Sequence, residues 1–382
     1  MYKRALNMSR LVSLKSFFLF GPRSTGKTTL LRTQFPDIQI INLLSSSVFM
    51  TLAENPSKLH DIIHEQSENH QLVIIDEIQK IPELLDEIHN LIESTPIHFI
   101  LTGSSARKLK RSGVNLLAGR AWQANLFPLV SSEIHDFDIH RYLQFGGLPQ
   151  VYTNEYPVEE LDAYINTYLK EEIQAEALVR NQISFTRFLK IAGLSNTLQL
   201  NYANIASDAG LPASTIRSYF SILEDTFTGF LLESWQESKK RKAVATPKFY
   251  FFDTGVANFL AGNNDIKKGS GEYGKVFEQF IAMELRAWLS YRRVKKTLRY
   301  WRTRSGTEVD FLIGDDTAIE VKTAERIQDK HLKGLRSLRE EDIFSRFILV
   351  SFDEINRKTT DGIRILHWSR FLELLWNDDF TD

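Results

Sequence analysis

The stretch GPRSTGKT at residues 21–28 constrains this chain more than any other feature of its sequence. It follows an apolar run, Phe17 to Phe20, that predicts a buried strand, and a helix is expected from Thr28 onward. A glycine-rich loop between a strand and a helix is the context in which GxxxxGK[ST] binds phosphate. The glycines let backbone N–H groups approach the phosphates, and the helix N-terminus adds positive charge. The sequence therefore predicts a P-loop in an α/β fold with a parallel sheet.

The side chains of this loop predict how a nucleotide is held. Lys27 is expected to reach the β- and γ-phosphates of ATP, and Thr28 to bind Mg²⁺. The residues expected to contact the nucleotide are Gly21, Pro22, Arg23, Ser24, Thr25, Gly26, Lys27, Thr28 and Thr29.

Two further apolar runs end in polar side chains. QLVIIDEIQKIP predicts a buried strand followed by acids, of which Asp76 would hold Mg²⁺ through water and Glu77 would act as the hydrolytic base. IHFILTGSSARKL predicts another strand, whose tip offers the hydroxyls of Thr102, Ser104 and Ser105. We expect Ser104 to sense the γ-phosphate, with an ordinary polar turn as the alternative.

Composition excludes several classes of protein. A chain of 382 residues predicts two or three domains, and 43% hydrophobic with 25% charged residues is typical of a soluble globular protein. The absence of cysteine excludes disulfides, cysteine-ligated zinc and thiol catalysis. The net charge of −1 gives no global attraction to nucleic acid or membrane. No run approaches the roughly 18 apolar residues of a membrane span, so we expect a cytoplasmic protein without membrane contact.

The segments GPRSTGKT, VIIDE, ILTGSS and LLAGRAWQANLFPLVSSE together resemble the AAA+ ATPases. The resemblance implies ATP and Mg²⁺ as cofactors and a homo-oligomer, for which a hexameric ring is one arrangement. In that family an arginine of a neighbouring subunit completes the site, and Arg120 is the best match, with Arg107 second. It would neutralise charge on the transferred phosphoryl group. A solvated surface arginine is the alternative for either position.

Residues 136–190 predict amphipathic helices that serve as a lid or connector, with a turn at FGGLPQ, residues 145–150. The GGLP segment is similar to one in bacterial and archaeal ATPases that carry the DUF4143 region. That resemblance covers nearly the whole chain.

Residues 191–265 resemble a winged helix-turn-helix. Apolar periodicity predicts two short helices on either side of the turn Gly210-Leu211-Pro212. The second would present Thr215, Arg217 and Ser218 to DNA, and the basic run KKRK, residues 239–242, would contact phosphates as a wing. A structural or protein-binding winged helix is the alternative.

The stretch EVDFLIGDDTAIEVK, residues 308–322, predicts a hairpin that turns at Asp315. Paired residue numbers then sum to 630, so Asp310 lies opposite Glu320 on one face. Opposed carboxylates destabilise a sheet unless something compensates them, and a divalent cation would do so. Glu308 and Lys322 are expected on that face, and Val309, Phe311, Ile319 and Val321 on the other.

This hairpin resembles the core of PD-(D/E)XK nucleases, in which a preceding helix supplies another acid. Glu278 in GEYGKVFEQFIAMEL would be that acid. The resemblance implies Mg²⁺ or Mn²⁺ on Glu278, Asp310 and Glu320, with the Val321 carbonyl as a further ligand and Lys322 stabilising the attacking water. The basic run at 291–304 would follow a phosphodiester backbone. A Glu308–Lys322 ion pair with surface acids is the alternative.

The sequence thus predicts an α/β architecture of several parts acting on DNA, with branched or single-stranded DNA as candidate substrates. The alternative is a nucleotide-switched scaffold whose distal domains bind proteins. The expected parts are an AAA+ ATPase domain at 1–135, a helical connector at 136–190, a winged helix at 191–265 and a restriction-endonuclease-like domain at 266–382.

Overall fold

The computed structural model describes residues 2–67, 71–107, 109, 117, 119–169, 182–238, 240–263, 265–377 and 380. Part of the predicted connector, residues 170–181, and Lys239 of the KKRK run lie outside the described residues.

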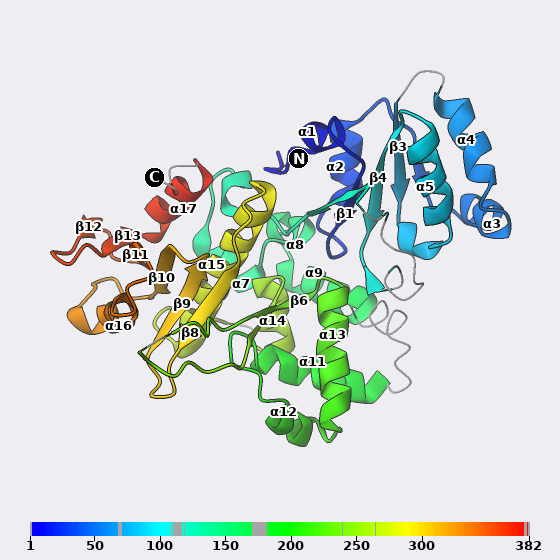
Figure 1. The fold of residues 1–382 in the computed structure, drawn as a ribbon. Coiled ribbons are helices and arrows are strands. Elements are labelled where there is room, and N and C mark those ends of the chain that lie inside the picture. Colours follow the sequence, from blue (N-terminus) through cyan, green and yellow to red (C-terminus); the bar gives the residue numbers. More distant parts are fainter. Residues whose placement is uncertain are drawn as a thin grey trace.

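The first part of the chain forms a parallel five-stranded sheet in the order β2-β3-β4-β1-β5. All four residues of β1 are buried because β4 and β5 flank this strand and helices cover the sheet (Figure 1). The strands are β1 (Phe17–Phe20), β2 (Ile40–Asn42), β3 (Leu72–Asp76), β4 (His98–Gly103) and β5 (Trp122–Asn125). The helices are α1 (Met8–Val12), α2 (Lys27–Gln34), α3 (Ser46–Glu54), α4 (Lys58–Ser67), η1 (Ile78–Lys80) and α5 (Leu84–Ser94).

The middle of the chain is mainly helical and has its own apolar core. The predicted helix pair is confirmed, since α12 ends at Ala209 and α13 begins at Ala213. A two-stranded antiparallel sheet, β6 with β7, follows α13. The elements are η2 (Ser131–Glu133), α7 (Ile139–Phe145), α8 (Pro149–Thr153), α9 (Pro157–Ala163), the π-helix η3 (Tyr164–Leu169), α11 (Gln182–Leu194), α12 (Tyr202–Ala209), α13 (Ala213–Asp225), β6 (Gly229–Leu232), β7 (Lys248–Phe251) and α14 (Thr254–Ala261).

The predicted GGLP turn lies between α7 and α8. Gly146 has φ +81°, and a side chain at this position would overlap the Asp253 carboxylate, so the turn requires glycine. Asp253 accepts a hydrogen bond from the Gly147 N–H at 2.8 Å and also caps α14. The turn thereby joins the beginning of the helical region to its end and directs α8 back toward the first sheet.

The last part of the chain is a mixed six-stranded sheet in the order β12-β13-β11-β10-β9-β8. The elements are α15 (Gly271–Tyr291), β8 (Leu298–Arg302), β9 (Glu308–Ile313), β10 (Thr317–Val321), η4 (Asp329–Leu332), α16 (Lys333–Arg339), β11 (Arg346–Ser351), β12 (Arg357–Lys358), β13 (Arg364–His367) and α17 (Trp368–Trp376). No helix among the described residues is long and apolar enough to cross a membrane.

The hairpin register is as predicted, because Thr317 pairs with Ile313 and Ile319 with Phe311. One expectation about its faces is wrong. Val309 packs in the cluster of Trp301 on the face opposite that of Phe311. The pairing of β8 with β9 shifts by one residue between Arg299 and Trp301, and a bulge of this kind breaks the side-chain alternation.

Helix α15 joins the N-terminal and C-terminal parts of the molecule (Figure 1). Its apolar side, including Phe277, Phe280 and Leu285, belongs to one core with residues of both sheets. Glu284 in its middle is buried and accepts hydrogen bonds from the Ser131 N–H at 2.7 Å and from the Trp376 indole at 2.6 Å. A single carboxylate thus connects the loop after β5 to α17.

We predict that Glu284 makes stability depend on pH. Burial raises its pKa from 4.5 to about 7, so the folded chain binds this proton more tightly than the unfolded chain does. The free energy of unfolding should therefore fall as pH rises from 4.5 to about 7, on the order of 3 kcal/mol in total, and level off above. Chemical denaturation at pH 5 and pH 8 measures this change in the free energy of unfolding. The change should be absent in Glu284→Gln and should remain in the exposed control Glu272→Gln. Equal pH dependence in wild type and Glu284→Gln would contradict the assignment.

Candidate functional site

The P-loop lies between β1 and α2, where the sequence predicted it. Gly26 precedes the helix with φ +91°, a conformation that glycine adopts without strain. The Lys27 ammonium donates to the carbonyls of Gly21 at 2.7 Å and Pro22 at 3.0 Å, so it lies along the loop. Arg4 donates to the Thr25 carbonyl at 2.7 Å and holds the loop from the N-terminal segment.

The Mg²⁺ ligands expected from the sequence lie together. The Thr28 hydroxyl donates to Asp76 Oδ2 at 2.9 Å, which joins the first turn of α2 to the end of β3. Thr102 donates to the other oxygen of Asp76 and accepts from the Glu77 N–H at 3.1 Å, so Thr102 orients the acids. A hydroxyl and a carboxylate are hard oxygen donors that suit Mg²⁺, so Thr28 and Asp76 fit this ion.

Glu77 belongs to a buried polar group that includes a residue the sequence analysis missed. Gln79 donates from its amide to Glu77 Oε2 at 2.5 Å and to Ser104 Oγ at 3.1 Å. Ser104 thus lies beside the expected base, whereas Ser105 accepts from the backbone of Arg107. The available signal was an amide two residues after Glu77 in DEIQ, on a turn where Glu77 has φ +64°.

The two candidate arginines lie in different surroundings. Arg120 precedes β5 and donates to Glu93 at 2.8 Å with its side chain partly exposed. Trp122 pairs with Phe17 at the beginning of β1, whereas the P-loop follows the end of β1. Arg120 therefore lies at the end of the sheet opposite the P-loop, and it could complete a site only in a neighbouring subunit. Arg107 is buried and pairs with Asp225 at 2.9 Å, which joins the loop after β4 to α13.

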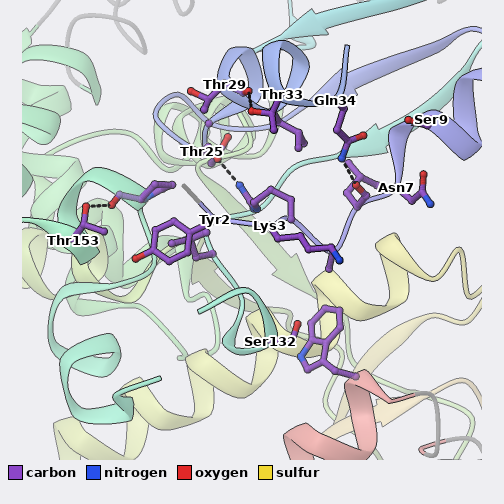
Figure 2. Close-up of a pocket in the computed structure, with 18 of the residues that line it drawn as sticks. Tyr2, Lys3, Asn7, Ser9, Thr25, Thr29, Thr33, Gln34, Ser132 and Thr153 are labelled. Atoms are coloured by element: carbon purple, nitrogen blue, oxygen red, sulfur yellow. Dashed lines mark hydrogen bonds between the residues drawn. The ribbon is translucent and has the colours of Figure 1, made fainter. Parts of the chain in front are cut away.

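A cavity of about 1030 Å³ extends from one side of the P-loop (Figure 2). Thr25 and Thr29 lie on one wall, and Ser132 and Thr153 come from the loop after β5 and from α8. The N-terminal residues 2–7 and Ser9 border it, and Arg292, Trp376 and Asn377 of the last part of the chain also contribute. Three parts of the chain thus enclose the space next to the phosphate loop.

The acids of the C-terminal half also come together. Asp310 and Glu320 face each other on β9 and β10, and Asp310 accepts from the Val321 N–H at 2.8 Å. Lys322 donates to Glu320 at 2.5 Å and to the Val321 carbonyl at 3.1 Å, and it lies 3.9 Å from Asp310. Burial, and then the Asp310 carboxylate, raise the pKa of Glu320 to about 8.

Glu278 has partners that the sequence did not predict. It accepts from Lys248 at 2.9 Å and from the Tyr250 hydroxyl at 2.6 Å, both on β7. Lys248 also pairs with Glu308, which in turn accepts from Arg302 at 2.8 Å. The Glu308–Lys322 pair considered from the sequence is therefore wrong, because Glu308 is held by other cations.

A divalent cation does not fit these acids as they are placed. The lysine ammonium groups contact the oxygens that a metal would need, and within the described part of the chain no three His, Cys, Asp or Glu side chains are arranged to hold a metal ion. One oxygen of Glu320 is nevertheless buried without a hydrogen-bond partner.

The basic runs expected to contact DNA are largely engaged within the chain. Arg241 of the KKRK run donates to the Ser337 carbonyl at 2.7 Å and to Glu340 at 2.6 Å. In the run at 291–304, Arg299 pairs with Glu237 and Arg302 with Glu308. On α13, Arg217 and Ser218 are exposed and Thr215 is half-buried. Of the expected surfaces, α13 remains the more open.

Comparison with protein families assigns the three parts of the chain. Residues 14–135 match the model of an AAA domain, and residues 273–371 match a domain of unknown function, DUF4143. These matches support an AAA-domain ATPase of the DUF4143 family. Residues 136–267, between the AAA domain and the DUF4143 region, match a further domain of unknown function, DUF8612.

The curated relatives that match most of this chain are described as uncharacterized proteins. An uncharacterized protein of Mycobacterium tuberculosis is 27% identical over 322 residues, which cover 81% of this chain and 69% of the relative. An uncharacterized protein of Methanocaldococcus jannaschii is 24% identical over 343 residues, covering 80% of this chain and 73% of the relative.

Among solved structures, a signal transduction ATPase with numerous domains (STAND) and a tetratricopeptide repeat sensor from Pyrococcus horikoshii is 16% identical, with a TM-score of 0.22. The match covers 75% of this chain and 46% of that one, so this chain spans less than half of the Pyrococcus protein. C. elegans PCH-2 is also 16% identical with a TM-score of 0.22, covering 56% of this chain and 64% of its own.

Proposed function

We propose that this chain hydrolyses ATP and uses the cycle to act on DNA. The observation that carries the first part is the placement of Thr28, Asp76 and Glu77 beside the P-loop lysine. A cation-binding pair and an acid next to a phosphate loop are what hydrolysis of a terminal phosphoryl group needs.

Each residue has a physical role in the proposed reaction. The backbone N–H groups of the loop and Lys27 hold the β- and γ-phosphates, and Thr28 and Asp76 hold Mg²⁺, which neutralises phosphate charge. Glu77 accepts the proton of the attacking water. Ser104, which lies 3.4 Å from Glu77, contacts the γ-phosphate, and Gln79 keeps both side chains in place. Arg120 acts in the site of a neighbouring copy, which makes the active form a homo-oligomer, with a hexameric ring as one arrangement.

The cavity beside Thr25 and Thr29 suits the ribose and base of the nucleotide. It begins at the phosphate loop, and its size is in the upper range of small-ligand pockets. Tyr2 and the indole of Trp376 offer apolar surface, while Ser132 and Thr153 offer hydroxyls. We therefore propose that ATP lies between the AAA domain, α8 and the last part of the chain, which contributes Arg292 and Trp376.

The proposal of DNA action rests on α13 and the nuclease-like acids. The second helix of the pair exposes Ser214, Arg217 and Ser218. The guanidinium carbon of Arg217 lies 4.2 Å from the centre of the Tyr202 ring. An exposed arginine on the second helix is a common means of contacting DNA. The helix-borne Glu278 next to the hairpin acids supports a nuclease-like domain, in which Asp310, Glu320 and Lys322 would be the cleaving residues.

A second candidate is a nucleotide-switched scaffold that binds proteins. The specific observation in its favour is that Arg241, Arg299 and Arg302 pair with carboxylates of the same chain. Cations held in this way contribute less to binding a phosphate backbone, which depends on unpaired positive charge.

We predict that two substitutions separate binding from hydrolysis. Lys27→Ala should weaken ATP affinity at least about 10-fold, because the phosphates lose a direct ammonium contact. Glu77→Gln should keep the affinity and lower turnover by about 10²–10⁴-fold, because the water loses its base. Fluorescent-nucleotide titration and phosphate release measure the two effects. Turnover in Glu77→Gln equal to that of wild type would remove Glu77 as the base.

A DNA-binding surface on α13 predicts that DNA changes the turnover. Duplex, forked and single-stranded DNA should raise phosphate release by wild type, and Arg217→Ala should reduce the stimulation while basal turnover stays unchanged. Lys190→Ala, at an exposed position of α11, is the matched control. The DNA assignment would fail if none of the three DNAs altered turnover or bound the chain, and the scaffold candidate would then be favoured.

A further inference from the structure

Four carboxylates and two lysines meet where α15 and β7 approach the C-terminal hairpin. The carboxylates are Glu278 of α15, Glu308 and Asp310 of β9 and Glu320 of β10. The lysines differ in origin, since Lys322 follows β10 whereas Lys248 begins β7, far away in the sequence. The cluster is thus built from the DUF4143 region together with one strand of the preceding domain.

Lys248 is fixed in this cluster. Its backbone pairs with Leu232 of β6 and bridges to Gln199, so the strand determines where the side chain points. Its ammonium contacts Glu278 at 2.9 Å, pairs with Glu308 and lies 5.3 Å from the centre of the Tyr300 ring. A buried ammonium is tolerated only when paired in this manner.

The two lysine side chains differ in how easily they can move away from the carboxylates and into solvent. The Lys248 side chain is 5% exposed and that of Lys322 is 35% exposed. The Lys322 side chain can therefore rotate into solvent and release the Glu320 carboxylate. The second oxygen of that carboxylate is buried and has no hydrogen-bond partner. The buried Lys248 side chain has no comparable path to solvent. Lys248 and the Tyr250 hydroxyl both donate to Oε1 of Glu278.

We propose that Lys248 is a built-in cation that occupies the Glu278 side of the cluster and keeps divalent metal away from Glu278. A metal ion and an ammonium would compete for one carboxylate oxygen and repel each other at close range. The cluster then accepts at most one divalent cation, on Asp310, Glu320 and the Val321 carbonyl, after Lys322 moves. Glu278 serves as the counter-ion of Lys248, which differs from its expected role as a metal ligand.

The test is Mn²⁺ binding to the full chain, followed by the electron paramagnetic resonance signal of free Mn²⁺. All variants carry Asp76→Asn, which removes the proposed P-loop ligand. The main variant, Lys248→Met/Glu308→Gln, removes one positive and one negative charge, so that the net charge of the cluster is preserved. Glu308→Gln alone and Lys268→Met, at an exposed lysine paired with Glu325, are the controls.

The chain with Lys248 intact should bind at most one Mn²⁺, and Glu278→Gln should change that affinity by less than about twofold. Lys248→Met/Glu308→Gln should gain a Mn²⁺ site, or bind at least about 10-fold more tightly, and should lose the gain when Glu278→Gln is added. Loss of Mn²⁺ binding in Glu278→Gln alone would overturn the proposal. So would a folded double variant that binds Mn²⁺ as the controls do. The result is independent of whether DNA is cleaved or ATP is hydrolysed.

Discussion

The guanidinium of Arg4 is the interaction on which the arrangement of the nucleotide site depends. It donates to Glu133 at 2.8 Å, to the carbonyls of Thr25 and Phe127 at 2.7 and 2.6 Å, and to the Tyr291 hydroxyl at 3.4 Å. These acceptors belong to the P-loop, the segment after β5 and the end of α15. Removing one member of a buried charged network lowers the free energy of unfolding by roughly 3–5 kcal/mol. The three segments that Arg4 joins are therefore held together firmly.

Helix α15 carries this connection to the other end of the molecule. Tyr291 at its end contacts Arg4, Glu284 in its middle binds Ser131 and Trp376, and Glu278 near its beginning meets Lys248. A helix of 21 residues is about 30 Å long, and α15 is buried along most of its length, so this one helix connects the two regions through packed contacts. The proposed nucleotide cavity, which the DUF4143 region helps to enclose, lies at the Tyr291 end.

The sequence was most informative where structure depends on near neighbours. The P-loop follows from a strand, a glycine-rich loop and a helix adjacent in the chain, and the hairpin register follows from one turn. What it could not reveal were contacts between distant segments. Lys248 meets Glu308 across 60 positions because β7 packs beside β9, and Arg241 meets Glu340 because the segment after β6 lies on α16. Periodicity indicates which side of an element is apolar, but it does not identify the partner of a charged side chain.

In the proposed arrangement, a nucleotide on the P-loop is held jointly by the AAA domain and the last part of the chain. Hydrogen exchange measured by mass spectrometry, with and without Mg²⁺ and a slowly hydrolysed ATP analogue, tests it most directly. We expect slower exchange in α2 and also in α17 and the last turns of α15. Protection confined to the P-loop and α2, with α15 and α17 unchanged, would contradict it.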